Sequence, residues 1–158
     1  MKILVILGEG GHTAQMLKLV DLLGPVYDYS YLILAHDQTS EAKIEIAGPI
    51  YRTGIPRGKS PTLLTTLKLA FLCSSQELAI LFKVRPKVIL SAGAGVAVPI
   101  SIFGRLLGIK IIHVESASRV HALSLTGKIM YHIAHLFFVQ WKSLQATHPK
   151  AIYAGRLL

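Results

Sequence analysis

The 158-residue chain contains few cysteines, few acidic residues and few aromatic residues. Cys73 is its only cysteine, which excludes an intrachain disulfide and a metal site built on several thiolates. Only 8 residues are Asp or Glu against 17 Lys and Arg, so the formal net charge is +9. The cationic residues form no basic run and are not interleaved with aromatic side chains, so the sequence predicts no nucleic-acid partner.

Apolar residues make up 52% of this basic chain. A composition that is both basic and apolar indicates a membrane surface or a phosphate-bearing partner. The chain begins with Met1 and Lys2 and continues directly into an apolar run, so no signal peptide or spanning helix is predicted before that run. The length predicts one domain, 1–158, with a buried core.

Strand-like and helix-like segments alternate along the chain, which predicts the α/β class with one doubly wound parallel sheet. Glycine or polar turns follow four of the strands, at the carboxyl ends where such sheets bind ligands. These turns are 8–12, 36–40, 92–95 and 115–119. The predicted strands are 3–7, 29–34, 50–53, 88–91, 110–114, 136–139 and 152–154, and the predicted helices are 12–23, 61–82, 98–107 and 125–134.

The predicted helix 61–82 is apolar on almost every side. Its polar interruption at 74–77 leaves an apolar stretch too short for a spanning helix. One interpretation is a long core helix, either continuous or split in two. The other is a monotopic helix in the headgroup layer of a membrane, with its lysines on anionic lipid. In that second interpretation the membrane contacts are Leu67, Lys68, Phe71 and Leu72.

The first turn, 8–13, joins a hydrophobic strand to a helix with the sequence Gly-Glu-Gly-Gly-His-Thr. Glycines let the backbone come close to a phosphate, and the helix amino terminus adds a partial positive charge, so the turn predicts an anion site. His12 adds a titratable group beside it. The turn lacks the ending of a P-loop and the spacing of a dinucleotide fingerprint. In the alternative interpretation the glycines only form a tight turn and His12 caps the helix.

A second small-residue turn, 91–95, also follows a strand and precedes a helix. By itself it is equally well explained as a simple turn. Two such turns in one sheet can converge on one pyrophosphate, because each contributes backbone N–H donors. The residues predicted to bind this group from the two turns are Gly8, Gly10, Gly11, Thr13, Gly93, Ala94 and Gly95.

Two carboxylates that end strands are candidate acid/base groups. Glu115 follows the strand 110–114 and is succeeded by Ser116 and by Arg119, a phosphate-binding candidate. The alternative is a Glu115–Arg119 ion pair that caps the next helix. Asp37 ends the second strand and is either a base or a cap of the following turn. No metal site is predicted, because the spacing of the remaining histidines is not that of metal ligands.

Six short motifs occur along the chain: 8–13 (GEGGHT), 92–95 (AGAG), 113–116 (HVES), 123–128 (LSLTGK), 139–141 (VQW) and 153–155 (YAG). Through these motifs and their order the chain resembles a known family, the acceptor-side subunit of the bipartite UDP-N-acetylglucosamine transferase of asparagine-linked glycosylation, with its bacterial relatives in capsule and exopolysaccharide synthesis. The resemblance covers residues 2–156 and extends, more distantly, to the amino-terminal half of a two-domain glycosyltransferase-B fold.

This resemblance implies a half-enzyme with a Rossmann-like fold. Such a subunit holds a polyprenyl-diphosphate-linked saccharide at the cytoplasmic face of the membrane. Eukaryotic members carry a membrane anchor before the first strand, and the sequence predicts none here, so we expect peripheral or monotopic attachment through 61–82. A separately encoded subunit binds the UDP-sugar, and inverting transfer proceeds without a metal or other cofactor. The two glycine turns, with Ser116 and Arg119, would hold the acceptor diphosphate. The candidates for the base are Glu115 and His12, ahead of Asp37.

Two further interpretations remain open from the sequence. The chain could be a non-catalytic membrane scaffold that recruits and activates a complete transferase. It could also be a small α/β protein that binds a nucleotide or a phosphosugar and has no relation to lipid. The donor sugar is equally open between UDP-N-acetylglucosamine, UDP-glucuronate, UDP-galactose and UDP-glucose.

Overall fold

The computed structural model of the protein describes the backbone of residues 1–54 and 63–157, and the side chains of these residues except 63–73. Within this part of the chain, seven strands pair in parallel to form one sheet. The strands are β1 (Lys2–Ile6), β2 (Asp28–Leu34), β3 (Ile50–Thr53), β4 (Val88–Ser91), β5 (Lys110–Val114), β6 (Leu136–Val139) and β7 (Ala151–Tyr153).

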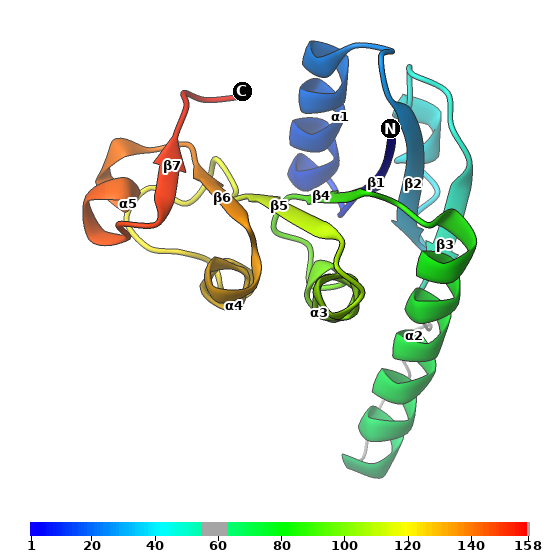
Figure 1. Cartoon of the computed structure of the whole chain (residues 1–158). Coiled ribbons are helices and arrows are strands. Elements are labelled where there is room, and N and C mark those ends of the chain that lie inside the picture. Colours follow the sequence, from blue (N-terminus) through cyan, green and yellow to red (C-terminus); the bar gives the residue numbers. More distant parts are fainter. Residues whose placement is uncertain (55–62, 158) are drawn as a thin grey trace.

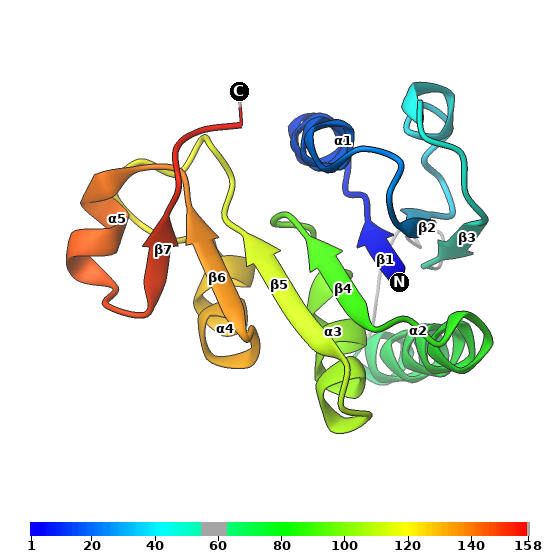
Figure 2. The same ribbon diagram turned by 45° about the horizontal axis from the view of Figure 1, so that its top comes forward.

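The strand order is β3-β2-β1-β4-β5-β6-β7, so the direction in which the chain adds strands reverses between β1 and β4. Open parallel sheets bind ligands beside such a switch point, outside the carboxyl ends of the strands. Figure 2 shows the arrowheads of β4, β5, β6 and β7 at the same edge. The predicted doubly wound parallel sheet is therefore confirmed.

Helices cover both faces of the sheet (Figure 1). Helix α1 (Gly11–Leu23) lies on one face, and α3 (Ala97–Leu106) and α4 (Leu125–Ile133) lie on the other. Alternate residues of each strand enter separate cores, as the period of two in a strand requires. In β1, Leu4 and Ile6 pack in the core that includes α3 and α4, and Val5 packs in the core that includes α1.

Helix α2 (Leu63–Val84) ends two residues after the predicted end, and the predicted start at 61–62 lies outside the described residues. Glu77, Ile80, Leu81 and Val84 are buried, with the spacing of one helix face, so this end of α2 is a core helix. The predicted membrane contacts Leu67, Lys68, Phe71 and Leu72 lie outside the described side chains. Among the helices that the structure describes, none combines the length and the hydropathy that crossing a bilayer requires.

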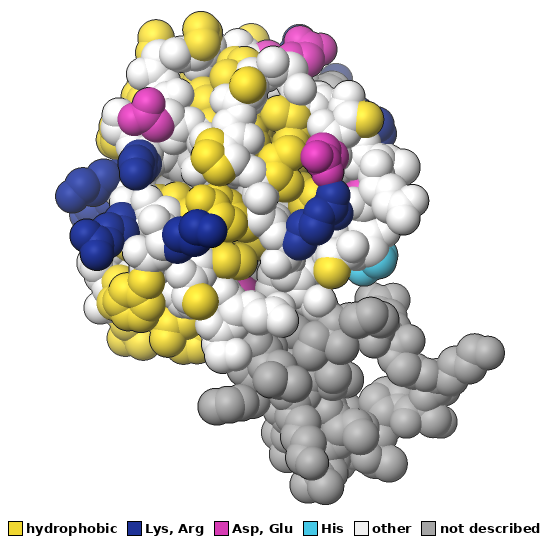
Figure 3. Space-filling model, turned by 90° about the vertical axis from the view of Figure 1, so that its right-hand side faces the viewer, with side chains coloured by type: hydrophobic (Ala, Val, Ile, Leu, Met, Phe, Trp, Pro, Cys, Tyr) yellow, Lys and Arg dark blue, Asp and Glu magenta, His cyan; other side chains and the backbone are white. Residues whose placement is uncertain are grey.

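The basic and apolar composition is visible on the surface. On the face drawn in Figure 3, lysine and arginine side chains stand next to exposed hydrophobic ones. The largest exposed apolar side chains on the helices α2, α3 and α4 include Phe82, Leu106 and Leu125.

Two short elements were not predicted from the sequence. They are the 3-10 helix η1 (Glu41–Lys43) and the helix α5 (Lys142–Thr147). Both are too short for a hydrophobic period of 3.6 to be recognised, and short helices depend on tertiary packing for their stability. Leu144, which is fully buried, anchors α5 to the core. The predicted strands 3–7 and 152–154 each lie one residue too late along the chain.

Candidate functional site

The turns that follow β1, β4 and β5 lie next to one another, because these strands are neighbours in the sheet. Ile6, Ser91 and His113 occupy one row across the three strands. Two residues beyond that row, at the carboxyl edge, come Gly8, Gly93 and Glu115. The two glycine turns that sequence reasoning paired thus sit on adjacent strands, one on each side of the switch point.

The His12 side chain lies against the glycines of both turns. A Cβ atom built on Gly8 would stand 2.8 Å from the His12 Cβ, and one built on Gly93 would stand 2.5 Å from its Cε1. Gly93 also has a positive φ of 63°. Both positions therefore require glycine, because any side chain would collide with His12. We call Gly8 and Gly93 the imidazole seat; the sequence had suggested only a phosphate-binding role for them.

His12 belongs to the first turn of α1 and is not its cap. The N-cap position is Gly10, with φ 57°, and no side chain hydrogen-bonds there. The alternative interpretation of His12 as a helix cap is therefore wrong. Its Nδ1 atom is buried and has no hydrogen-bond partner among the described residues. The histidine is held by packing alone, and one of its ring nitrogens is available for a hydrogen bond.

Open space adjoins the imidazole seat. A Cβ atom on Gly10, Gly11 or Gly95 would meet no heavy atom within 4 Å. These glycines therefore leave room for a ligand to approach the backbone at the amino terminus of α1, where the helix dipole favours an anion. Ala94 is buried below this space.

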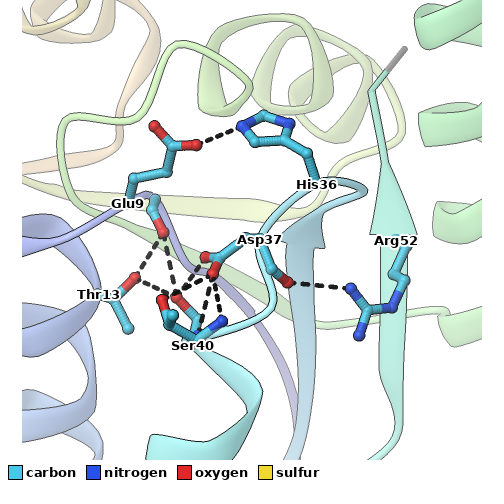
Figure 4. Close-up of polar contacts among 8 residues, drawn as sticks. Glu9, Thr13, His36, Asp37, Ser40 and Arg52 are labelled. Carbon is cyan, nitrogen blue, oxygen red and sulfur yellow. Dashed lines mark hydrogen bonds and ion pairs between the residues drawn. The ribbon is translucent and has the colours of Figure 1, made fainter. Parts of the chain in front are cut away.

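Asp37 is connected to the first glycine turn by hydrogen bonds through Ser40 and Thr13 (Figure 4). Its carboxylate accepts hydrogen bonds from the backbone N–H groups of Thr39, at 2.9 Å, and Ser40, at 3.0 Å. Ser40 Oγ lies 2.8 Å from the hydroxyl of Thr13, which donates to the carbonyl of Gly8. Burial by itself raises the pKa of Asp37, but the hydrogen bonds from Ser40 and Thr39 outweigh it and hold the pKa below its usual value. The carboxylate caps the turn that follows β2.

Two exposed ion pairs border this arrangement, and Figure 4 shows the one between Glu9 and His36. Glu9, in the first glycine turn, pairs with His36, and Glu41 pairs with Arg52. Arg52 also donates to the backbone carbonyl of Asp37 at 3.1 Å. These contacts link the loop after β2 to β1 and β3, although exposed pairs contribute little to stability.

Glu115 is fully buried and its carboxylate is occupied within the chain. It accepts hydrogen bonds from the N–H of Ser116, at 2.9 Å, and from the N–H and hydroxyl of Ser124, at 3.2 and 2.9 Å. Ser124 is the N-cap of α4, where its hydroxyl accepts from the N–H of Gly127. A Cβ on Gly127 would lie 1.7 Å from a Glu115 oxygen. The carboxylate therefore anchors the amino terminus of α4.

The ion pair between Glu115 and Arg119 that the sequence offered as an alternative is not among the ion pairs of the described residues. Arg119 is exposed at the carboxyl edge. Ser116 is buried, and its hydroxyl lies 2.9 Å from that of Ser118.

His113 is a buried polar residue that sequence reasoning did not select as a site residue. Its side chain is fully buried, its ring stacks on Phe137 at 5.3 Å, and its Nδ1 lies 2.9 Å from Ser91 Oγ. Burial, with a smaller contribution from the charge of His12, lowers the pKa of His113 to about 3. The ring is neutral at physiological pH. The strand period was the available signal, since it places His113 on the same buried face as Ile111.

A buried amide network ties α1 to the loops after β5 and β6. Gln140 donates to Gln15 Oε1 at 2.8 Å and to the carbonyl of Glu115 at 3.0 Å. Gln15 Oε1 also accepts from the N–H of Ala117, and Trp141 Nε1 donates to the Ala117 carbonyl at 2.7 Å. These contacts explain the 139–141 motif as a device that holds the neighbouring loops at the carboxyl edge.

An apolar cavity of about 350 Å³ lies beside this network, on the face of the sheet that carries α1. None of the residues predicted for catalysis or diphosphate binding lines it. Its lining comes from α1, from β4, β5 and β6, and from the carboxyl-terminal segment, and includes Leu19, Leu23, Leu90, Ile112, Phe138 and Leu157. In the part of the chain that is described, no group of three or more His, Cys, Asp or Glu side chains is arranged to hold a metal ion.

Comparison with known proteins assigns the chain to a family. Residues 3–157 match the family described as "Oligosaccharide biosynthesis protein Alg14 like". The chain belongs to the Alg14 family. The match spans both glycine turns, the His113–Glu115 region and the amide network.

Relatives in the Alg14 family are similar over almost the whole chain. The human protein named "UDP-N-acetylglucosamine transferase subunit ALG14" is 33% identical, over 100% of this chain and 83% of its own length. The protein of the same name from Schizosaccharomyces pombe is also 33% identical, over 97% of this chain and 81% of its own length. The resemblance inferred from the six motifs is thereby confirmed.

Solved structures show the same fold in larger proteins. MurG of Acinetobacter baumannii superposes with a TM-score of 0.69 at 20% identity, over 87% of this chain and 40% of MurG. The UDP-GlcNAc 2-epimerase of Neisseria meningitidis, bound to UDP-GlcNAc, superposes with a TM-score of 0.70 at 14% identity, over 99% of this chain and 47% of the epimerase. The chain thus spans about half the length of these proteins. The predicted Rossmann-like half of a glycosyltransferase-B fold is confirmed.

Proposed function

We propose that this chain is the acceptor-side subunit of a two-component inverting glycosyltransferase. It would transfer a sugar from a UDP-sugar to a polyprenyl-diphosphate-linked saccharide at the cytoplasmic face of a membrane. The names of the Alg14 relatives support N-acetylglucosamine as the sugar. The proposal rests on the position of His12. Its side chain packs against Gly8 and Gly93 at the switch point, next to glycines whose backbone has open space in front of it.

In the proposed reaction His12 is the general base. The acceptor hydroxyl attacks the anomeric carbon, the new carbon–oxygen bond forms, and the bond to UDP breaks with its electron pair on the leaving diphosphate. The hydroxyl proton passes to His12 Nε2. Of the three predicted bases, His12 is the one whose side chain makes no hydrogen bond with a described residue, whereas the oxygens of Asp37 and Glu115 accept hydrogen bonds from neighbouring residues.

The acceptor diphosphate would lie over the open backbone of the two turns. Gly10 and Gly11 at the amino terminus of α1, with Gly95 across the switch point, leave space for it. Thr13 would contribute only its backbone, because its hydroxyl is engaged with Gly8 and Ser40. Arg119, exposed at the same edge, would supply a cation for a phosphate oxygen. Asp37 and Glu115 would act by positioning: Asp37 braces the first turn, and Glu115 fixes the start of α4.

The partner would be a separately encoded subunit that binds the UDP-sugar. A relative named as a subunit implies an assembly, and this chain spans about half the length of its structural neighbours. We propose that the apolar cavity beside α1 receives this partner, since its apolar lining would otherwise contact water. The amino-terminal part of α2, with Leu67, Lys68, Phe71 and Leu72, remains the proposed contact with the membrane.

A transfer assay with the partner subunit tests the proposal. His12→Ala should reduce turnover about 10²–10⁴-fold, the usual contribution of a general base, with binding of the partner unchanged. The matched control is His36→Ala, which removes an exposed histidine from the same edge. If the chain is a scaffold that only recruits a complete transferase, His12→Ala and His36→Ala will both retain full activity. Appreciable turnover by the isolated chain would also contradict the two-component division.

A further inference from the structure

Two histidines at the switch point each carry a buried ring nitrogen without a hydrogen-bond partner. In the described structure these atoms are His12 Nδ1 and His113 Nε2. Leaving a buried polar atom unpaired is unfavourable, so a pair of such atoms in one region indicates an interaction that completes both.

The two rings belong to one small neighbourhood. His113 stands in register with Ser91 on β4, and Gly93, on which the His12 ring rests, comes two residues after Ser91. The charge of His12 is also one of the causes of the low pKa of His113. His12 therefore lies just beyond the row that contains Ser91 and His113, at the carboxyl edge of β4 and β5.

We propose that His113 is a positioning residue for His12, an inference that rests on the proposed function of His12 as the base. In this arrangement one water molecule joins the two unpaired atoms, accepting from His12 Nδ1–H and donating to His113 Nε2, because no direct hydrogen bond connects them in the described structure. His113 Nδ1–H in turn donates to Ser91 Oγ. These hydrogen bonds hold His12 in the tautomer whose lone pair is on Nε2, the atom that accepts the proton from the acceptor hydroxyl.

A neutral imidazole suits this role because it carries one N–H and one lone pair. Once the N–H of His113 is committed to Ser91, its other nitrogen is necessarily an acceptor. Its low pKa, caused by burial and by His12, also keeps the transferred proton on His12. In many enzymes a carboxylate orients the catalytic histidine through the second ring nitrogen.

The charged and titratable groups around His12 are otherwise engaged. Glu9, in its own turn, pairs with His36 from the loop after β2. Asp37, from that same loop, accepts its hydrogen bonds from Thr39 and Ser40. Glu115, beyond β5, anchors α4. His113, at the carboxyl end of β5, is a fully buried titratable side chain of this neighbourhood, and its Nε2 has no partner among the described residues.

The tautomer of His12 can be measured on the purified chain by ¹⁵N NMR of its ring, without any activity assay. We expect the Nδ1–H form to predominate in the wild-type chain and to become the minor form in His113→Phe, which keeps an aromatic ring against Phe137 but has no nitrogen. His113→Gln should restore the wild-type tautomer, because its amide can accept from the bridging water and donate to Ser91. The matched control is His135→Phe, a histidine outside this neighbourhood whose Nδ1 accepts from the N–H of Ile111.

Ser91→Ala provides a second route if His113→Phe does not fold, because it removes the acceptor that orients His113 and should also reduce the Nδ1–H form. The proposal would be overturned if His12 carried its proton on Nε2 in the wild-type chain. It would also be overturned if the tautomer of His12 were unchanged in His113→Phe or, where that variant does not fold, in Ser91→Ala. With the partner present, His113→Phe should lower kcat roughly 10- to 100-fold with little change in KM, less than the loss in His12→Ala. Full activity of His12→Ala would instead overturn the proposed function and leave the NMR result standing.

Discussion

Substitution of Gly93 by alanine tests whether the imidazole seat is what requires glycine at this position. The added Cβ would stand 2.5 Å from His12 Cε1 and 2.8 Å from its Nδ1. It would also place a non-glycine residue at a φ of 63°. The first effect depends on His12, and the second does not, so the two can be separated.

The expected size of each effect follows from these two observations. An L-residue in the left-handed region costs about 1–2 kcal/mol of folding free energy. Overpacking a closed site costs about a further 1–3 kcal/mol. Gly93→Ala should therefore lower the free energy of unfolding by both amounts in the wild-type background. In the His12→Ala background, where the ring is absent, only the backbone cost of about 1–2 kcal/mol should remain.

Urea unfolding of the isolated chain measures this difference through a double-mutant cycle of Gly93→Ala and His12→Ala. Gly108→Ala is the control, because Gly108 has a φ of 76° but open space where its Cβ would lie. Its cost should be the same with and without His12. Equal costs of Gly93→Ala in the two backgrounds would refute the imidazole seat. Transfer activity with the partner should fall about 10²-fold or more in Gly93→Ala, since a displaced base loses its alignment.

Three further predictions concern residues away from the imidazole seat. Burial raises the pKa of Glu77 to about 8 from 4.5, so the folded chain should lose stability as pH rises from about 4.5 to about 8. Glu77→Gln should flatten this pH dependence of the free energy of unfolding, measured by urea titration at several pH values. An unchanged pH dependence in the variant would contradict the prediction. Gly127→Ala, whose Cβ would overlap the Glu115 carboxylate, should lower the free energy of unfolding by about 1–3 kcal/mol or more, whereas Lys128→Ala on the exposed side of α4 should not. Leu23→Arg, in the lining of the apolar cavity, should weaken association with the partner subunit in a pull-down or titration, and Leu22→Arg, outside that lining, should leave it intact.

Much of the fold could be predicted because a parallel sheet has a strong local signal. The strands 50–53, 88–91, 110–114 and 136–139 have the predicted bounds, since each is a short run in which residues common in strands, such as Val, Ile, Phe, Tyr and Thr, predominate. The helix α5 could not be predicted, because six residues contain less than two turns of any period. Its existence depends on Leu144 reaching the core.

The candidate site could be located from the sequence but its chemistry could not be assigned. Glycine turns at strand ends indicate the edge at which ligands bind, and the structure brings the two predicted turns together on neighbouring strands. Glu115 was an attractive base because it follows a strand, yet burial and three donors from Ser116 and Ser124 commit it to α4. Which partners a carboxylate finds depends on residues that come near it only in the folded chain.

The amino-acid sequence by itself determined the class of the protein: the order of strands and helices, the glycine turns behind β1 and β4, and the absence of a thiolate metal site are properties of neighbouring residues along the chain. The tertiary structure decided which side chain those turns contact. Placing β1 beside β4, although more than 80 residues separate them in the chain, brings Gly8 and Gly93 onto the two sides of His12. A contact of that kind arises from sheet topology. The hydrophobic pattern of a strand specifies that the strand is buried, but which strand pairs with it depends on how the whole domain packs.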